Sequence, residues 1–206
     1  MGRHFKTLLD LACGRAISDE DGGQARRLQL IIAGLLGSLV FAALWGLAAG
    51  SQAPGLAAAN LYKVPMVVLL SALAATPAGL LAWKLSGAQC RGSDLVISFV
   101  AAIFSGTLVM AVVSPLVALY YHSSTWAGPV LGMGSTFLAL LVGTVIFIRG
   151  VFLRRPAATP RGALVLPVAV FVVMQAATLV QLVALAAPIL PELTVFDGGI
   201  DRMVHR

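Results

Sequence analysis

The sequence predicts an all-α integral membrane protein with five transmembrane helices and an N-terminal amphipathic helix at the membrane interface. Of its 206 residues, 59% are hydrophobic and only 11% are charged, with a mean hydropathy of +0.96. An ordinary soluble domain is about 25% charged. A helix that crosses a bilayer needs about 20 apolar residues in succession. Uncharged runs of this kind occupy residues 28–49, 64–83, 95–121, 128–148 and 163–187.

The basic residues alternate between successive connections, which supports the count of five. Eleven of the 14 Lys and Arg residues precede the first run or lie in the second and fourth connections. By the positive-inside rule these segments are cytoplasmic. We therefore expect a cytoplasmic N-terminus and an extracytoplasmic C-terminus. Because the basic residues flank the runs, the net charge of +6 reflects topology, and we expect no nucleic-acid partner.

Residues 1–27 form a cytoplasmic amphipathic segment and hinge before the predicted bundle of residues 28–187, and residues 188–206 form a short extracytoplasmic tail. We predict an interfacial helix whose basic residues Arg3, Lys6 and Arg15 contact anionic lipid headgroups. A soluble helix packed on a partner is the alternative. The apolar positions of the N-terminal segment follow the spacing of one helix face: Phe5, Leu8, Leu9, Ala12, Cys13, Ala16 and Ile17.

The five runs contain no Asp, Glu, Lys, Arg or His residue. Proton-coupled and sodium-coupled transporters normally carry a buried carboxylate or matched broken helices. The nearest match to an intramembrane serine protease loop, "AIFSG" at 102–106, lacks the first glycine of that loop. Metal-binding, haem-binding and phosphate-binding motifs are also absent from the sequence. We therefore expect no enzymatic activity, no metal site and no cofactor.

Small and polar residues stand out within the runs. Small residues spaced four apart allow helix backbones to approach closely, and amides in hydrocarbon need hydrogen-bond partners. These residues either tie the five helices together or bind a partner subunit or a lipid. The candidates for such packing are Gly34, Ser38, Ser105, Gly106, Gln175, Thr178 and Gln181, and the further small pairs are 33/37, 101/105, 102/106 and 139/143.

Prolines interrupt three of the runs. Pro65 falls in the first turn of its predicted span, where proline is tolerated. Pro77, Pro115 and Pro167 lie inside theirs, so each removes a backbone hydrogen bond and is expected to kink its helix. At Pro77 we expect the hydroxyls of Thr76 and Ser71 to satisfy the freed backbone.

Three stretches, "KVPMVVLLSALAATPAGLLAWKLSG" (63–87), "SPLVALYYHSST" (114–125) and "MQAATLVQLVALAAPIL" (174–190), resemble small bacterial five-span membrane proteins. They are more distantly similar to the Yip-domain family. The resemblance implies five spans, a cytoplasmic N-terminus and a non-enzymatic scaffold that binds other membrane proteins. The long cytoplasmic N-terminal domain of Yip-domain proteins has no counterpart here, so its partner-binding role is not carried over. The most specific matching residues are Lys63, Val64, Pro65, Ser114, Pro115 and Gln175.

The leading functional hypothesis is an accessory or scaffold subunit that packs beside a larger membrane protein complex in the bacterial cytoplasmic membrane. One alternative is a lipid-binding or membrane-shaping protein. Another is a channel or transporter for a small neutral or lipidic solute. The expected partners are membrane lipids and membrane protein subunits.

Overall fold

Five long helices make up almost all of the structure, a computed structural model that describes residues 6–10, 23–124, 126–157 and 159–190. Each is long and apolar enough to cross a bilayer. The all-α, five-span prediction is therefore confirmed. The helices are α2 (Gln24–Ala49), α3 (Pro54–Leu85), α4 (Gly92–Ser123), α5 (Ala127–Leu153) and α6 (Arg161–Ala186).

Helix α3 begins well before the predicted span. The uncharged run starts after Lys63, but the helix starts at Pro54, because a charge ends an apolar run without ending a helix. Residues 54–62 are rich in alanine, the best helix former. Pro54 therefore takes the first-turn position, and the prediction that Pro65 lies in the first turn is wrong. The Lys63 ammonium donates to the carbonyl of Pro188 at 3.3 Å, on the surface.

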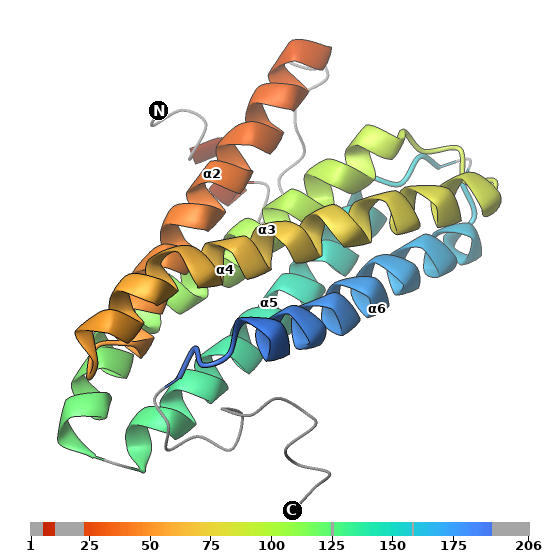
Figure 1. Cartoon of the computed structure of the whole chain (residues 1–206). Coiled ribbons are helices and arrows are strands. Elements are labelled where there is room, and N and C mark those ends of the chain that lie inside the picture. The colour runs from red at the N-terminus through yellow and green to blue at the C-terminus, as the bar shows by residue number, and fades with distance from the viewer. Residues whose placement is uncertain (1–5, 11–22, 125, 158, 191–206) are drawn as a thin grey trace, which may run out of the picture.

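The helices follow the spatial order α5, α4, α2, α3, α6 around an incomplete ring (Figure 1). Helix α4 packs extensively on α2 and α5, and α3 packs extensively on α2 and α6. Helices α5 and α6 close the ring with little contact. Helix α4 is the most enclosed, with 61% of its most apolar window buried, against 22% for α5.

A close helix contact lies between α4 and α5. A Cβ atom added at Gly106 would lie 2.8 Å from the carbonyl oxygen of Ala139, and one added at Gly143 would lie 3.1 Å from that of Ala102. Two small pairs, 102/106 and 139/143, therefore face each other. With no side chain between them, the two backbones approach to van der Waals distance.

The N-terminal residues in the structure pack on α2 and α4. Residues 6–10 are helical, and Leu8 is buried in a cluster with Ile97, Ala101 and Phe104. A Cβ atom at Gly34 would lie 3.3 Å from Leu8 Cδ2. Leu8, on the predicted apolar face, thus contacts this chain's own bundle.

Helices α3, α4 and α6 continue through their internal prolines. Pro115 frees the carbonyl of Ala111, which accepts a hydrogen bond from Ser114 Oγ at 2.6 Å. Kinks at Pro77, Pro115 and Pro167 stay predictions.

The prediction for the backbone at Pro77 is wrong. Pro77 frees the carbonyl of residue 73, but Thr76 Oγ1 donates to Ala72 O at 2.7 Å and Ser71 Oγ to Val68 O at 3.0 Å. A hydroxyl in a helix reaches back to a carbonyl three or four residues earlier. Ser71 precedes the freed group, so its hydroxyl points away from it.

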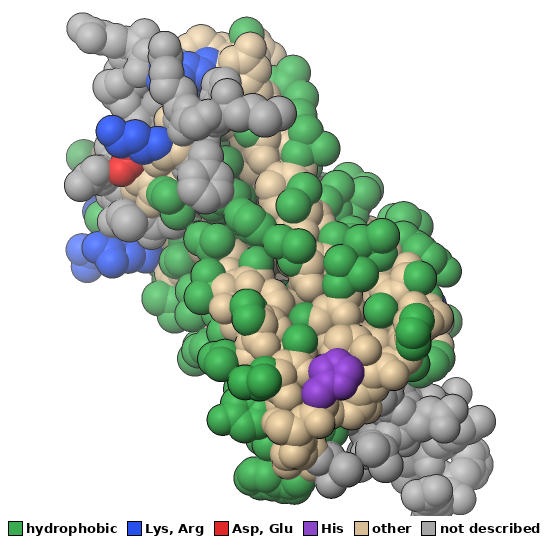
Figure 2. All heavy atoms as spheres, turned by 90° about the vertical axis from the view of Figure 1, so that its left-hand side faces the viewer, with side chains coloured by type: hydrophobic (Ala, Val, Ile, Leu, Met, Phe, Trp, Pro, Cys, Tyr) green, Lys and Arg blue, Asp and Glu red, His purple; other side chains and the backbone are tan. Residues whose placement is uncertain are grey.

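Charged residues tie three helices together at one end of the bundle. Arg27, at the start of α2, bonds Asp94 at 2.8 Å and Ser93 at 2.7 Å in the first turn of α4. Arg154, after α5, donates to Ser98 Oγ. The pKa of Arg154 is lowered, chiefly by burial, although nearby Asp94 favours its charged form. Figure 2 shows basic side chains gathered at one end of an otherwise apolar flank, and the positive-inside rule predicts that this end faces the cytoplasm.

Candidate functional site: an apolar cavity that opens between α5 and α6

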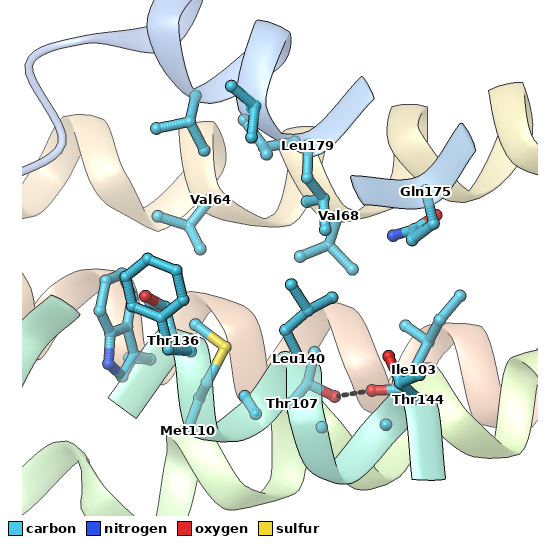
Figure 3. Close-up of a pocket in the computed structure, with 18 of the residues that line it drawn as sticks. Val64, Val68, Ile103, Thr107, Met110, Thr136, Leu140, Thr144, Gln175 and Leu179 are labelled. Carbon is cyan, nitrogen blue, oxygen red and sulfur yellow. Dashed lines mark hydrogen bonds between the residues drawn. The ribbon is translucent and has the colours of Figure 1, made fainter. Parts of the chain in front are cut away.

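A cavity of about 320 Å³ lies inside the incomplete ring, between the pair α4 and α5 and the pair α3 and α6 (Figure 3). This volume lies in the range of small-molecule sites, about 300–1,000 Å³. Aliphatic side chains from four helices face one another across it, and they include Val64, Val68, Ile103, Met110, Leu140 and Leu179.

The cavity opens sideways between α5 and α6. Phe137 and Leu140 on α5 and Val180 on α6 line the cavity and are also exposed on the outside of the bundle, at 67%, 38% and 51%. They therefore form the rim of an opening where the two helices make little contact. In a bilayer this opening faces lipid chains, because both helices are spans.

Aromatic rings bound the cavity at the end of the bundle where the basic side chains gather. Phe99 and Phe147 line it, with ring centroids 5.5 Å apart. The ring of Phe171 lies behind them, 4.8 Å from Phe99 and 5.4 Å from Phe147. This cluster of three rings fills the space between α4, α5 and α6, and Gly79 on α3 leaves room for Phe171.

At the other end the chain after α6 turns back over the bundle. Ile189 and Leu190 line the cavity there. Asn60 Nδ2 on α3 donates to the carbonyl of Ile189 at 2.6 Å, and Lys63 reaches Pro188 close by. Since both ends are bounded by apolar side chains, the opening between α5 and α6 is the route that suits a lipidic ligand.

Few polar groups line the cavity, and none of the lining residues is ionisable. Gln175 on α6 is 9% exposed, and its Nε2 donates to Ser71 Oγ on α3 at 3.0 Å. Its Oε1 has no hydrogen-bond partner within the part of the chain that the structure describes. The hydroxyls of Thr107 and Thr136 donate to carbonyls of their own helices.

The small residues predicted for helix packing lie at contacts within the bundle. Gly34 and Ser38 are buried on α2, and Ser38 Oγ donates to Gly34 O at 2.7 Å. Ser105 Oγ donates to Ala101 O at 2.7 Å, and Gly106 lines both the cavity and the α4–α5 contact. No partner chain is needed to explain their positions.

The three polar residues of α6 have different surroundings. Gln175 bonds to α3, whereas Thr178 Oγ1 donates to Met174 O of its own helix at 2.6 Å. Gln181 is exposed on the outside of the bundle. Of the predicted headgroup residues, Lys6 is exposed, and Arg3 and Arg15 lie outside the described residues.

Sequence reasoning missed Thr144 and the cavity itself. Thr144 on α5 lines the cavity and makes no hydrogen bond with the described residues. Its position directly after Gly143 of a small pair was the available signal. Sequence reasoning also missed the hydrogen bond from Trp45 Nε1 on α2 to Ser135 Oγ on α5, 2.9 Å long.

The site does not hold a recognisable metal-binding cluster: in residues 6–10, 23–124, 126–157 and 159–190, no group of three His, Cys, Asp or Glu side chains could bind an ion. Comparisons of the chain with protein-family models, curated proteins and solved structures find no match. The function therefore has to follow from the five-span bundle and its cavity.

Proposed function

We propose that this protein is a non-enzymatic lipid-binding membrane protein whose cavity takes up the apolar part of a lipidic molecule from the bilayer. The observation that carries the proposal is the apolar cavity of about 320 Å³ with exposed rim residues on two spans. A ligand entering between α5 and α6 exchanges lipid neighbours for protein neighbours without crossing water. Shape and dispersion contacts then decide which chain fits, as they do between helices in a membrane.

This function accounts for the cavity better than solute transport does. A path across the membrane needs openings toward both aqueous sides, whereas aromatic rings bound this cavity on one side and Ile189 and Leu190 on the other. The lining also lacks the ionisable groups that mark ion and proton pathways.

A photoreactive lipid tests the proposal. The purified protein in nanodiscs is irradiated with an alkyl-diazirine phospholipid, and the labelled peptides are mapped. We expect labelling concentrated on cavity-lining positions of α5 and α6. The substitution Val183→Phe fills the cavity and should therefore remove most of this labelling. Val173→Phe, on the same helix but 63% exposed and outside the cavity lining, is the matched control. Labelling of equal intensity on all sides of the bundle would contradict lipid binding in the cavity.

A role as an accessory subunit is the second candidate, and Gln181 supports it. This amide is exposed within α6 and makes no hydrogen bond with the described part of the chain. An amide that faces hydrocarbon gains from a partner on another helix. The resemblance to Yip-domain scaffolds points the same way.

Native electrophoresis of membranes solubilised in mild detergent checks this second candidate. If Gln181 binds a partner subunit, Gln181→Leu should shift the tagged protein from a larger species to its monomer size. Val173→Phe, on an exposed part of the same helix, should not. A wild-type protein that migrates as a monomer under these conditions argues against the subunit role.

We further propose a bacterial cytoplasmic membrane location with the N-terminus inside. Two glycines in open space at opposite ends of the bundle, Gly55 and Gly162, allow a test without disturbing the packing. In a background without native cysteines, a membrane-impermeant maleimide added to intact cells should label Gly55→Cys and not Gly162→Cys. The reverse pattern would invert the topology.

A further inference from the structure

We propose that the ligand of this cavity is a neutral long-chain alcohol, whose hydroxyl group binds between Gln175 and Thr144. The inference rests on the proposed function, since it names the ligand class of the same cavity. It concerns the polar part of the ligand, whereas the proposed function concerns only its apolar chain.

Gln175 provides the hydrogen-bond acceptor. Its side chain is nine-tenths buried and reaches from α6 toward the interior of the cavity (Figure 3). Ser71 holds its Nε2, so the amide has a defined position, but nothing in the described chain bonds to Oε1. An unsatisfied buried acceptor is costly, and native structures rarely keep one without a reason. A donor on the ligand would satisfy it.

Thr144 provides a second polar contact. Figure 3 shows Thr144 on α5 and Gln175 on α6 at the same end of the cavity, with Leu140 and Leu179 farther along it. The Thr144 hydroxyl is without a hydrogen-bond partner in the described chain, whereas the Thr107 hydroxyl is bonded to Ile103 O at 2.9 Å. A ligand hydroxyl both donates and accepts, so it can donate to Gln175 Oε1 and accept from Thr144.

The charge of the lining selects a neutral ligand. No lining residue is ionisable, so a phosphate or carboxylate placed here would lose its water without gaining a counter-charge. The rest of the wall is aliphatic and aromatic, which suits an unsubstituted chain. A neutral hydroxyl on such a chain matches both parts of the cavity.

Three ligands that share one alkyl chain test the inference: cetyl alcohol, cetyl methyl ether and cetyl phosphate. Binding to the wild-type protein in nanodiscs is measured by native mass spectrometry with competition. We expect the alcohol to bind about tenfold more tightly than the ether, the usual size of one net hydrogen bond. The phosphate should bind more weakly than the alcohol.

Variants then assign the preference to the two residues. Gln175→Leu and Thr144→Val should each reduce the preference for alcohol over ether while leaving ether binding unchanged. Thr136→Val is the matched control, because the Thr136 hydroxyl already donates to Met133 O at 2.7 Å. Ser71→Ala removes the same tie between α3 and α6 as Gln175→Leu does, so its thermal unfolding in detergent measures how much stability the loss of that hydrogen bond costs by itself.

The outcomes distinguish the two proposals. Equal binding of alcohol and ether by the wild type overturns this inference, and a water molecule would then be the partner of Gln175, while lipid binding stands. Tighter binding of the phosphate overturns the choice of a neutral ligand. A wild type that binds none of the three overturns the proposed function as well.

Discussion

Helix α5 lies between α4 and α6, and it meets these two helices in opposite ways. Against α4 its backbone lies in contact, because Gly106 faces Ala139 and Gly143 faces Ala102. Against α6 it makes little contact, and the cavity lies between them. Both contacts join two apolar spans of similar hydropathy. Hydrophobicity therefore cannot explain the difference.

The size of the facing side chains explains it. In lipid, helices gain little from burying apolar surface, so close packing decides which of them associate. Where glycine and alanine face each other, the backbones meet. The only glycine of α6 is Gly162 in its first turn, and farther along it presents Gln175, Leu179 and Val183 toward the cavity. Such side chains keep helices apart and leave room for a ligand.

The largest expected effect comes from filling the α4–α5 contact. Gly106→Val places a branched side chain where even a Cβ would lie 2.8 Å from a backbone oxygen. We expect a loss of about 1–3 kcal/mol in the free energy of unfolding, measured by thermal or denaturant unfolding in detergent.

Two further glycine substitutions serve as controls for Gly106→Val. Gly143→Val, whose Cβ would lie 3.1 Å from Ala102 O, should cost less than Gly106→Val. Gly134→Val, with nothing within 4 Å, should be close to neutral. Equal stability of all three variants would show that the α4–α5 contact does not depend on backbone approach.

The second prediction concerns the tie between α2 and α5. The Trp45 Nε1 to Ser135 Oγ hydrogen bond is fully buried. Hydrogen bonds between spans contribute on average about 0.6 kcal/mol, and at most about 1.7. A double-mutant cycle of Trp45→Phe and Ser135→Ala should give a coupling energy of this size. Additive single effects would mean that the bond is not needed to hold α5 in place.

A smaller effect is expected at the end of the bundle where the basic side chains gather. The side chains of Arg27 and Asp94 are 18% and 25% exposed, so water weakens their 2.8 Å ion pair. The cycle Arg27→Gln with Asp94→Asn should give a coupling of about 0.2–1 kcal/mol that falls as salt is added. A coupling insensitive to salt would instead assign the contact to hydrogen bonding, including that with Ser93.

The smallest expected effect concerns the rate at which Cys90 reacts with maleimide, and not the stability of the bundle. Cys90 is a buried free thiol that packs in a cluster with Phe99 and Phe147. Burial raises the pKa of Cys90, and the nearby Asp94 carboxylate acts in the same direction. Because the thiolate is the reactive form, maleimide labelling should be slow at neutral pH and accelerate as pH rises.

The same thiol reports on the α4–α5 contact. In a Cys13→Ser background, Gly106→Val should speed labelling of Cys90 if opening that contact loosens the cluster, whereas Gly134→Val should not. Fast labelling of the wild type at neutral pH would contradict the buried position of Cys90.

The polar candidates show how far sequence reasoning reached. It selected Gln175, because an amide in an apolar run needs a partner, and the structure places this residue in the cavity wall. It selected Gln181 by the same logic, and that residue faces outward. The sequence does not distinguish Gln175 from Gln181, because both are amides in the same apolar run. They differ in whether another helix of the bundle lies opposite the side chain. Thr144 escaped notice because threonine is readily satisfied by its own helix and draws no attention.

The sequence by itself determined the five spans, the alternation of basic ends and the small pairs, because each depends on hydropathy, charge or spacing within one segment. Only the tertiary structure decided that pair 102/106 faces pair 139/143. It also decided that α5 and α6 stay apart and that a cavity opens to the membrane there. These features depend on how side chains of different size meet across helices. The pattern of residues within one helix does not specify which helix packs against it.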